Sequence, residues 1–246
     1  MPLRVDSAGR THQGLVREKN EDALLLAPEM NLWVVCDGMG GHVGGQVASQ
    51  TAVATIAEAM RAGATAGQSP DPLAGAILLA NRAVYYRAKS DPALHNMGTT
   101  VVAIRQDGDV LHLCHVGDSR IYRFSRGRLE QVTRDHSLVN LYAENPAMAA
   151  RFGPANSNVI VRAVGLKEDV EVDHQLAPMQ PGDLYLLCSD GLIDEVDDWV
   201  VAELLADATT GPIEECAEAL IRAALLNGGH DNVTAVVLRI VEATAH

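Results

Sequence analysis

Short hydrophobic runs bounded by turn residues predict strands in several parts of the chain. Residues 31–36 (NLWVVC) end at an Asp-Gly pair, residues 184–188 (LYLLC) follow a Pro-Gly-Asp turn, and residues 233–241 close the chain. Two more pairs of runs are separated by short turn signals and are candidate β-hairpins: residues 99–104 with 110–116, and residues 120–124 with 128–132. Because hairpin strands are antiparallel, this pattern favours antiparallel sheets over a doubly wound parallel sheet.

Longer segments with helical periodicity lie before and after these strands. Residues 45–61 place hydrophobic side chains every three or four positions, and residues 72–88 begin with a proline, which suits the first turn of a helix. Residues 214–226 are amphipathic and stop at an Asn-Gly-Gly signal. Residues 138–152 are also predicted to be helical, with a polar loop at 154–158. Helices on both sides of a set of antiparallel strands predict an α+β sandwich.

The composition fits one domain. The chain has 246 residues, of which 48% are hydrophobic, which is enough for one sizeable core. We find no long linker and no internal repeat, and therefore expect a single domain over residues 1–246. The net charge of −13 disfavours a nucleic-acid partner, because phosphate backbones repel an acidic surface. The excess of carboxylates either keeps the chain soluble or gathers at a cation site, and composition alone does not decide between the two.

The four cysteines and residues 1–10 indicate the cellular compartment in which the protein is expected to work. The four cysteines form no C-x-x-C pair, and three of them lie in hydrophobic runs, so buried free thiols in a reducing compartment are expected. Residues 1–10 lack the hydrophobic core of a signal peptide, and no stretch of about 18 hydrophobic residues occurs. We therefore expect a cytoplasmic protein without membrane insertion.

Three aspartates stand at the ends of predicted strands. Asp37 and Asp190 each follow a strand, and Asp231 precedes the last one. The end of one antiparallel strand lies beside the start of its neighbour, so we expect the three to meet at one rim of a sheet. Their mutual repulsion would force protonation unless cations lay between them, and oxygen ligands suit Mg²⁺ or Mn²⁺ better than zinc. Two such ions together lower the pKa of a bridging water.

The glycine after Asp37 adds to this picture. Without a Cβ, the chain at Gly38 can turn sharply and present its carbonyl oxygen to a metal. The glycine-rich residues 39–45 are alternatively a nucleotide-binding loop, but the G-x-x-x-x-G-K-[ST] pattern is absent. A single Asp-Gly pair is usually an ordinary turn, so the inference depends on the combination of motifs.

Taken together, the motifs resemble those of the metal-dependent protein phosphatases called the PPM or PP2C family, in their compact bacterial form. They appear in the family's order and cover almost the whole chain. The motifs are residues 17–22 (REKNED), 35–42 (VCDGMGGH), 97–100 (MGTT), 115–120 (HVGDSR), 188–192 (CSDGL) and 229–234 (GHDNVT). The resemblance implies a four-layer α-β-β-α sandwich, in which two packed antiparallel sheets are flanked by helix pairs.

The resemblance also implies a metal site with two Mn²⁺ or Mg²⁺ ions. Asp37 is expected to bridge both ions, and the carbonyl of Gly38 to bind the second. Asp190 and Asp231 are expected to hold the first ion. Asp118, together with Asp190, resembles the ligand pair of a third, weaker metal.

Other residues acquire roles through the same resemblance. Arg17 is expected to grip the substrate phosphate, since its guanidinium fork matches phosphate oxygens, although a surface salt bridge is the alternative. Asp22 is expected to act through metal-bound waters, and Asn232 to orient either its loop or the residues around the metal ligands. His42 is a candidate general acid, with a metal-bound water as the alternative. Residues of about 138–160 correspond to a flap subdomain beside the active site.

Further histidines and a cysteine are predicted to be structural. His112 and His115 form an H-x-x-H pattern, but on a strand they would face opposite sides, which argues against a shared zinc ion. His136 is expected to hold the fold through hydrogen bonds. Cys188 is expected to be a core thiol, because hard cations do not select sulfur.

The function that the resemblance implies is hydrolysis of phosphoserine and phosphothreonine in phosphorylated proteins. The enzyme would oppose a bacterial Ser/Thr protein kinase. We expect the chain to be a monomer. The alternative is a catalytically inactive regulatory module that binds phosphoproteins on the same fold. Such modules usually lose metal aspartates, whereas all three are present here. A hydrolase acting on nucleotides or nucleic acid is a third possibility, which the lack of a basic patch and of stacking aromatics disfavours.

Overall fold

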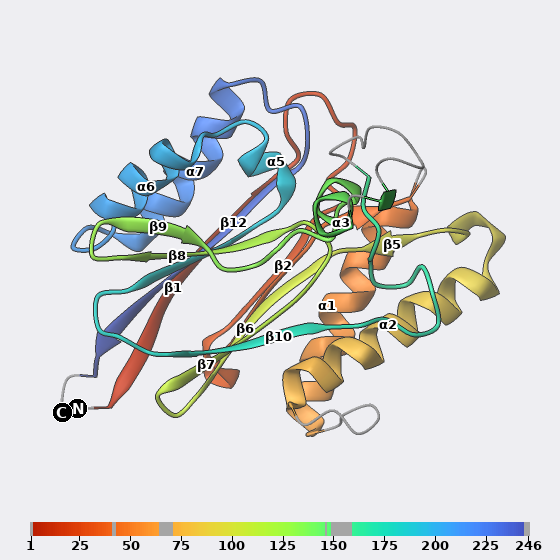
Figure 1. The fold of residues 1–246 in the computed structure, drawn as a ribbon, viewed down its shortest axis with the longest axis horizontal. Helices are drawn as coiled ribbons and strands as arrows, with labels where there is room; N and C mark the ends of the chain where they lie inside the picture. The colour runs from red at the N-terminus through yellow and green to blue at the C-terminus, as the bar shows by residue number, and fades with distance from the viewer. Residues whose placement is uncertain (1, 41–42, 64–70, 146, 149–158, 244–246) are drawn as a thin grey trace.

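Two five-stranded antiparallel sheets form the centre of the computed structural model, which describes residues 2–40, 43–63, 71–145, 147–148 and 159–243 (Figure 1). In spatial order the first sheet contains β1 (Leu3–His12), β12 (Val233–Glu242), β11 (Leu184–Cys188), β8 (Arg120–Ser125) and β9 (Arg128–Gln131). The second contains β10 (Asp173–Pro178), β7 (Val110–Val116), β6 (Val101–Asp107), β3 (Leu32–Cys36) and β2 (Ala23–Ala27). A short pair, β4 (Gly38–Met39) and β5 (Gly98–Thr99), lies beside α1.

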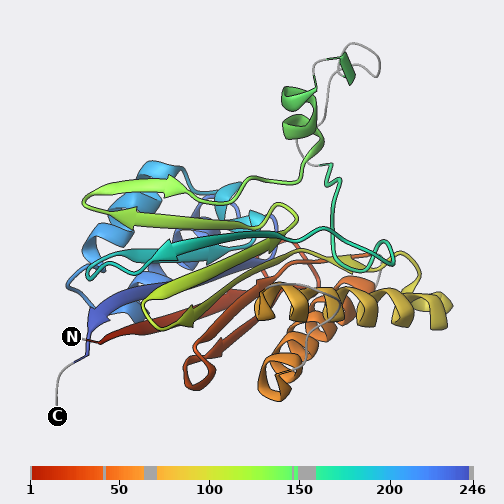
Figure 2. The same cartoon turned by 60° about the horizontal axis from the view of Figure 1, so that its bottom comes forward.

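Helices cover the outer face of each sheet (Figure 1). Helices α1 (Gly44–Ala62) and α2 (Pro72–Ser90) pack on the second sheet. Helices α5 (Asp190–Ile193), α6 (Asp198–Asp207) and α7 (Ile213–Leu226) pack on the first. Helix α3 (Leu138–Glu144) stands away from the sheets (Figure 2). The result is the expected four-layer α-β-β-α sandwich.

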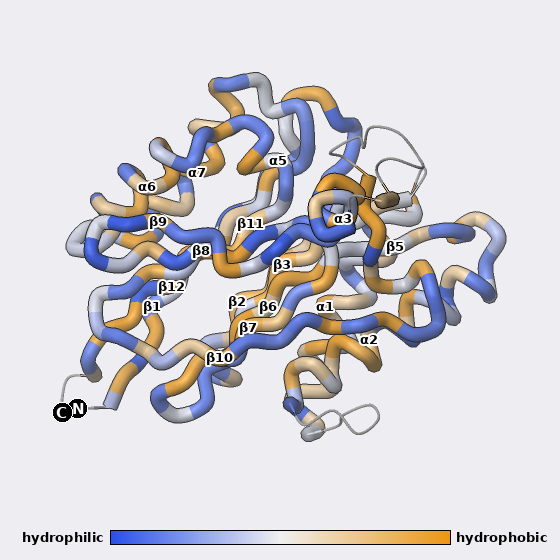
Figure 3. Tube along the Cα trace, in the orientation of Figure 1, coloured by the Kyte–Doolittle hydropathy of each residue, from blue (hydrophilic) through white to orange (hydrophobic). Residues whose placement is uncertain are grey.

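The side chains of the central strands alternate between the two faces of each sheet, which explains why each sheet is covered on both sides. In β3, Val34 faces the α1–α2 core, whereas Trp33 and Val35 face the core between the sheets. In β11, Leu186 faces the α6–α7 core and Tyr185 faces the core between the sheets. Successive side chains of a strand point to opposite faces, so strands that are hydrophobic at every position fit a sheet covered on both sides. Figure 3 shows these hydrophobic stretches along the central strands.

Most predicted elements are confirmed. Both hairpins are present, β6 with β7 and β8 with β9. The three long helices begin and end within two residues of the predicted bounds. Of the helix predicted over residues 138–152, the described part forms α3, and residues 149–158, which include the predicted polar loop, lie outside the described residues. Among the helices that the structure describes, none combines the length and hydrophobicity that crossing a membrane requires.

Several of the described elements were not predicted, among them β1, β2, β10 and α6. Strand β1 shows why, because its polar and small residues, such as Ser7 and Gly9, give no clear alternation. It forms by pairing with β12 over ten residues, from Leu3 with Glu242 to His12 with Val233. A hydrophobic neighbour that is distant in sequence therefore decides its conformation, which a local pattern does not reveal.

Candidate active site

Asp37, Asp190 and Asp231 meet at one end of the sandwich. Asp37 follows β3 of the second sheet, whereas Asp190 follows β11 and Asp231 precedes β12 of the first. The expectation that they share one rim of a single sheet is therefore wrong, since the cluster joins the ends of two packed sheets. All three line a cavity of about 460 Å³ together with Arg17 and Gly38. The carboxyls of Asp37 and Asp190 lie close enough together for each to shift the pKa of the other.

A second cavity, of about 480 Å³, adjoins the first. Arg17, Asp190 and Asp231 line both cavities, and Asp118 lines only the second. Asp190 thus faces both spaces, and it lines the second cavity together with Asp118, the residue expected to share a third ion with it. Asp194 also lines this cavity and was missed, because nothing in its sequence context distinguishes it from a helix-end aspartate.

Burial and crowding raise the pKa values of these carboxyls. Burial, and then the charges of Asp22 and Asp190, hold the pKa of Asp37 well above its ordinary value. Burial raises the pKa of Asp190, and the charge of Asp231 adds to this effect. Burial and the charge of Asp190 raise the pKa of Asp118 to about 7. Burial without enough positive charge favours the neutral carboxyl, so added cations would favour the ionised form.

Two of the carboxylates also have oxygens without a hydrogen-bond donor. Within the described part of the chain, Oδ1 of Asp118 and Oδ1 of Asp22 are buried and accept no hydrogen bond. The other oxygen of Asp22 accepts hydrogen bonds from Thr234 Oγ1 at 2.6 Å and Ser189 Oγ at 2.8 Å. A buried acceptor without a partner costs about 1–3 kcal/mol. The cluster therefore has open lone pairs as well as excess negative charge, and both properties fit hard cations.

Arg17 forms an ion pair with the cluster. Its Nη2 atom donates to Oδ2 of Asp231 at 2.6 Å, and its side chain is 55% exposed. The ion pair sets this partly exposed side chain at the edge of both cavities. A phosphate group held there would lie directly beside the carboxylates.

Asn232 fixes the loop that carries Arg17. Its Nδ2 atom donates to the carbonyl oxygens of Gln13 and Lys19, both at 2.8 Å. Its Oδ1 atom accepts the backbone N–H of Glu21 at 2.8 Å. These contacts connect both sides of the loop to the residue that follows Asp231, which agrees with the orienting role predicted for Asn232.

The backbone at Asp37 is fixed in a similar way. The carbonyl of Asp37 accepts hydrogen bonds from Thr99 Oγ1 at 2.8 Å and from the backbone N–H of Thr100 at 2.9 Å. Its N–H donates to Thr100 Oγ1 at 3.0 Å. This contact gives the 97–100 motif a role that sequence reasoning had not assigned. Gly38 follows in a space that excludes a side chain, because a Cβ there would lie 2.1 Å from the carbonyl oxygen of Gly45.

The histidines behave differently from one another. His42, the candidate general acid, lies outside the described residues. The Nε2 atom of His115 contacts the carbonyl oxygen of Arg134 at 2.9 Å, and its ring stacks on His136. His136 accepts the N–H of Gly117 at 3.0 Å through Nδ1. These contacts agree with the structural roles predicted for His115 and His136, and His112 faces the other side of the sheet.

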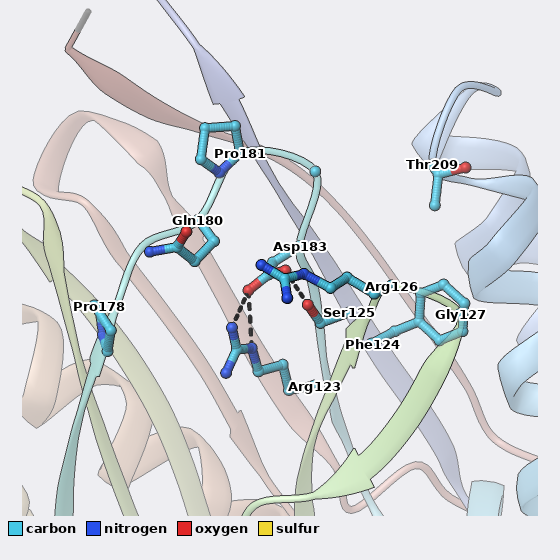
Figure 4. Close-up of a pocket in the computed structure, with 11 residues that line it drawn as sticks. Arg123, Phe124, Ser125, Arg126, Gly127, Pro178, Gln180, Pro181, Asp183 and Thr209 are labelled. Carbon is cyan, nitrogen blue, oxygen red and sulfur yellow. Dashed lines mark hydrogen bonds and ion pairs between the residues drawn. The ribbon is translucent and has the colours of Figure 1, made fainter.

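A larger cavity, of about 700 Å³, lies at the opposite end of β8 from Asp118 (Figure 4). Figure 4 shows that its charged side chains are directed at one another. Arg123 Nε donates to Oδ2 of Asp183 at 2.8 Å, and Ser125 Oγ also binds the Asp183 carboxylate. Because these groups satisfy one another, the smaller carboxylate-lined cavities are the better candidates for chemistry.

The fold and this arrangement agree with a known family. A family profile described as Protein phosphatase 2C matches residues 8–225, and the chain belongs to the protein phosphatase 2C family. It is 37% identical over 238 residues to the serine/threonine protein phosphatase PstP of Mycobacterium tuberculosis, an alignment that covers 96% of this chain and 45% of PstP. The chain therefore spans less than half the length of that relative.

Two further comparisons cover nearly the whole of both chains. The serine/threonine phosphatase stp of Listeria monocytogenes is 34% identical over 237 residues, which is 93% of each chain. A crystal structure of the PstP catalytic domain in complex with two manganese ions matches with a TM-score of 0.83 and 37% identity. That match covers 98% of this chain and 100% of that one.

Proposed function

We propose that this chain is a metal-dependent protein phosphatase that hydrolyses phosphoserine and phosphothreonine monoesters in proteins. The observation that carries the proposal is the convergence of Asp37, Asp190 and Asp231 on one cavity that Arg17 also lines. The names of the relatives, and the manganese ions in the PstP structure, support it. A Ser/Thr protein kinase that phosphorylates the same targets is the expected counterpart.

The proposed metal ligands follow the positions in the cavities. Asp37 would bridge two Mn²⁺ or Mg²⁺ ions, Asp190 and Asp231 would hold one of them, and the carbonyl of Gly38 would bind the other. Asp118, with its open Oδ1 atom, would share a third ion with Asp190. When bound, such ions would supply an activated water and neutralise charge on the phosphoryl group.

The chain's own residues would position the substrate. Arg17 would bind two phosphate oxygens through its guanidinium fork, since its side chain is exposed at the edge of the cavities. Asp22 is buried, and Thr234 and Ser189 fix one of its carboxylate oxygens. Its other oxygen would act on the metals through their bound waters. His42 would donate a proton to the departing serine or threonine oxygen, an assignment that rests on its place in the 35–42 motif.

We also propose that residues 1–246 form one domain and that residues of about 138–160 form a flap on it. At the base of this segment, the N–H of Leu138 donates to the carbonyl of Val159 at 2.8 Å, which brings its two ends together. Val139 lines one cavity of the site and Ile160 lines the other. Side chains at the base of the flap would therefore contact substrate residues around the phosphate.

Two further assignments belong to the same proposal. The four cysteines are buried and free, which fits a reducing cytoplasmic compartment. The chain is proposed to act as a monomer. Size-exclusion chromatography with light scattering is expected to give one chain per particle.

The direct test is hydrolysis of a phosphothreonine peptide by the purified chain. Activity is expected with Mn²⁺ and is expected to stop when a chelator is added. Binding of the peptide without turnover under every metal condition would instead indicate the inactive regulatory module. Turnover that persists in chelator would contradict the metal-dependent mechanism.

Replacing Asn232 by alanine is expected to weaken substrate binding through the loop that carries Arg17. Three backbone groups would lose their partners, so we expect the free energy of unfolding to fall by about 1–3 kcal/mol. KM for the phosphopeptide is expected to rise more than kcat falls, because Arg17 loses its position while the aspartates remain. An unchanged KM in the folded variant would contradict this role.

The raised carboxyl pKa values predict an unusual pH dependence in chelator. Asp22 and Asp118 have pKa values of about 7 in the folded chain, against about 3.9 for an unperturbed aspartate. The folded state therefore binds more protons between about pH 4 and pH 7, and these two groups make stability fall as pH rises through that range. Tm measured between pH 5 and pH 8 is expected to fall less steeply in Asp118→Asn than in the unsubstituted chain. Equal slopes would show that Asp118 titrates normally.

A further inference from the structure

A second group of potential metal ligands lies at the outer side of the second sheet, away from the carboxylate cluster. Asp71 caps the first turn of α2, where its Oδ1 atom accepts the N–H of Ala74 at 2.9 Å. His112 and Cys114 lie two residues apart on β7, and His174 on β10 is directly paired with Cys114. Residues with these positions share one face of the sheet, which here is the face that α2 covers.

The potential ligand atoms converge on one point. The Nε2 atom of His174 lies 3.3 Å from Nδ1 of His112 and 3.6 Å from Oδ2 of Asp71. The Oδ2 atom of Asp71 also contacts Nδ1 of His112, and Sγ of Cys114 lies 3.9 Å from Oδ1 of the same carboxylate. One ligand atom from each of Asp71, Cys114 and His174 fits within 4.8 Å of the others.

The separations from His174 to Asp71 and from Cys114 to Asp71 are close to those of a tetrahedral metal site, whereas His112 and Asp71 are in direct contact. Zinc bonds of about 2.0–2.3 Å to nitrogen, oxygen and sulfur place neighbouring ligand atoms about 3.3–3.8 Å apart. Three side chains, one imidazole, one thiol and one carboxylate, converge from three separate elements, and a water can complete a tetrahedral set of ligands. We propose that Asp71, Cys114 and His174 form a binding site for a zinc-class divalent cation, beside which His112 contacts Asp71.

The donor set distinguishes this site from the catalytic one. Sulfur and imidazole ligands select Zn²⁺ over Mg²⁺ and Mn²⁺, whereas the carboxylate cluster at the other site favours the harder ions. Burial and the charge of Asp71 raise the pKa of the Cys114 thiol, so a cation would be needed to make it a thiolate. His174 is partly exposed, so an ion can reach the site from solvent.

A second cluster, which consists of His115, His136 and Asp173, is a poorer candidate for a metal site. Of its three members, His115 contacts the carbonyl of Arg134, and His136 accepts the N–H of Gly117 and contacts Arg162. The imidazole nitrogens that would bind a metal are thus already engaged with the backbone and an arginine. A bound ion at Asp71, Cys114 and His174 would join the edge strand β10 to β7 and to the start of α2.

Cobalt provides the test, because a thiolate bound to Co²⁺ gives a charge-transfer absorption that an all-oxygen site does not. The full chain is first stripped with a chelator and saturated with Mn²⁺, and Co²⁺ is then titrated. One equivalent is expected to produce the charge-transfer band and the intense visible bands of a tetrahedral ion. Zn²⁺ added afterwards is expected to remove both.

Matched variants assign the ligands. Cys114→Ser is expected to lose the charge-transfer band, whereas Cys188→Ser, a control at another buried thiol, is expected to keep it. His174→Ala, on the edge strand, is expected to weaken Co²⁺ binding by more than about 100-fold, since even residues that only support metal ligands contribute 10–100-fold. Its Mn²⁺-dependent phosphatase activity is expected to stay unchanged. A chain without the band, or a band that survives in folded Cys114→Ser or His174→Ala, would overturn the proposal.

Discussion

Replacing Asp190 by asparagine is expected to lower kcat for Mn²⁺-dependent hydrolysis of a phosphothreonine peptide by at least about 100-fold, the scale on which removal of one preorganised electrostatic group acts. The side chain keeps its size but loses its charge. Asp190 lines both cavities of the site, and its charge acts on Asp37 and Asp118. It is therefore the carboxylate whose loss affects the largest part of the proposed metal site.

The same substitution is expected to leave the fold intact. Removing one charge relieves repulsion in the cluster, so Tm in chelator is expected to stay level or to rise. Mn²⁺ is expected to raise Tm less in the variant than in the unsubstituted chain. Asp169→Asn is the control, because that carboxylate is 89% exposed and lies outside the cavities. Asp190→Asn with more than a tenth of the original kcat would contradict the assignment.

Gly38→Ala is expected to damage both the fold and the proposed metal site. The new methyl group would lie 2.1 Å from the carbonyl oxygen of Gly45 and 2.5 Å from that of Glu21. Backbone atoms must move to accommodate it, at a cost of about 1–3 kcal/mol in unfolding free energy. The shift would displace both Asp37 and the carbonyl proposed to bind an ion, so phosphatase activity is expected to be lost as well.

Urea unfolding and the phosphopeptide assay together check this prediction. Gly127→Ala is the control, because a Cβ there meets no atom within 4 Å, although its φ of 77° imposes some strain of its own. The control is expected to lose stability modestly and to keep its activity. Gly38→Ala with unchanged stability and kcat would show that the space around Gly38 adapts more easily than its contacts indicate.

The sequence pattern predicted the elements that local chemistry decides. Both hairpins have glycine-containing turns, and Gly108 has the positive φ of 58° that such a turn requires. The long helices have clear periodicity and end signals. Strand β1 was missed because its pairing with β12 joins residues more than 200 positions apart. Tertiary contacts, which a local window does not contain, decide such elements.

The candidate site, too, could be predicted only in part from the sequence. The positions of Asp37, Asp190 and Asp231 at strand ends were visible in the sequence, but the pattern did not show which sheet holds each strand. Their convergence arises from the packing of two sheets. Likewise, the hydrogen bonds that connect Thr99 and Thr100 to the Asp37 backbone depend on a contact across more than 60 residues. A motif marks such residues, whereas only the fold shows what they touch.

The measurement that tests the central claim most directly is a crystal structure of the chain grown with Mn²⁺, with anomalous scattering recorded at the manganese edge. Two strong anomalous peaks are expected between the carboxylates of Asp37, Asp190 and Asp231, with the Gly38 carbonyl among the ligands of one ion. Peaks located elsewhere, or no peak at a site where these three side chains diverge, would contradict the proposed metal centre and the phosphatase mechanism built on it.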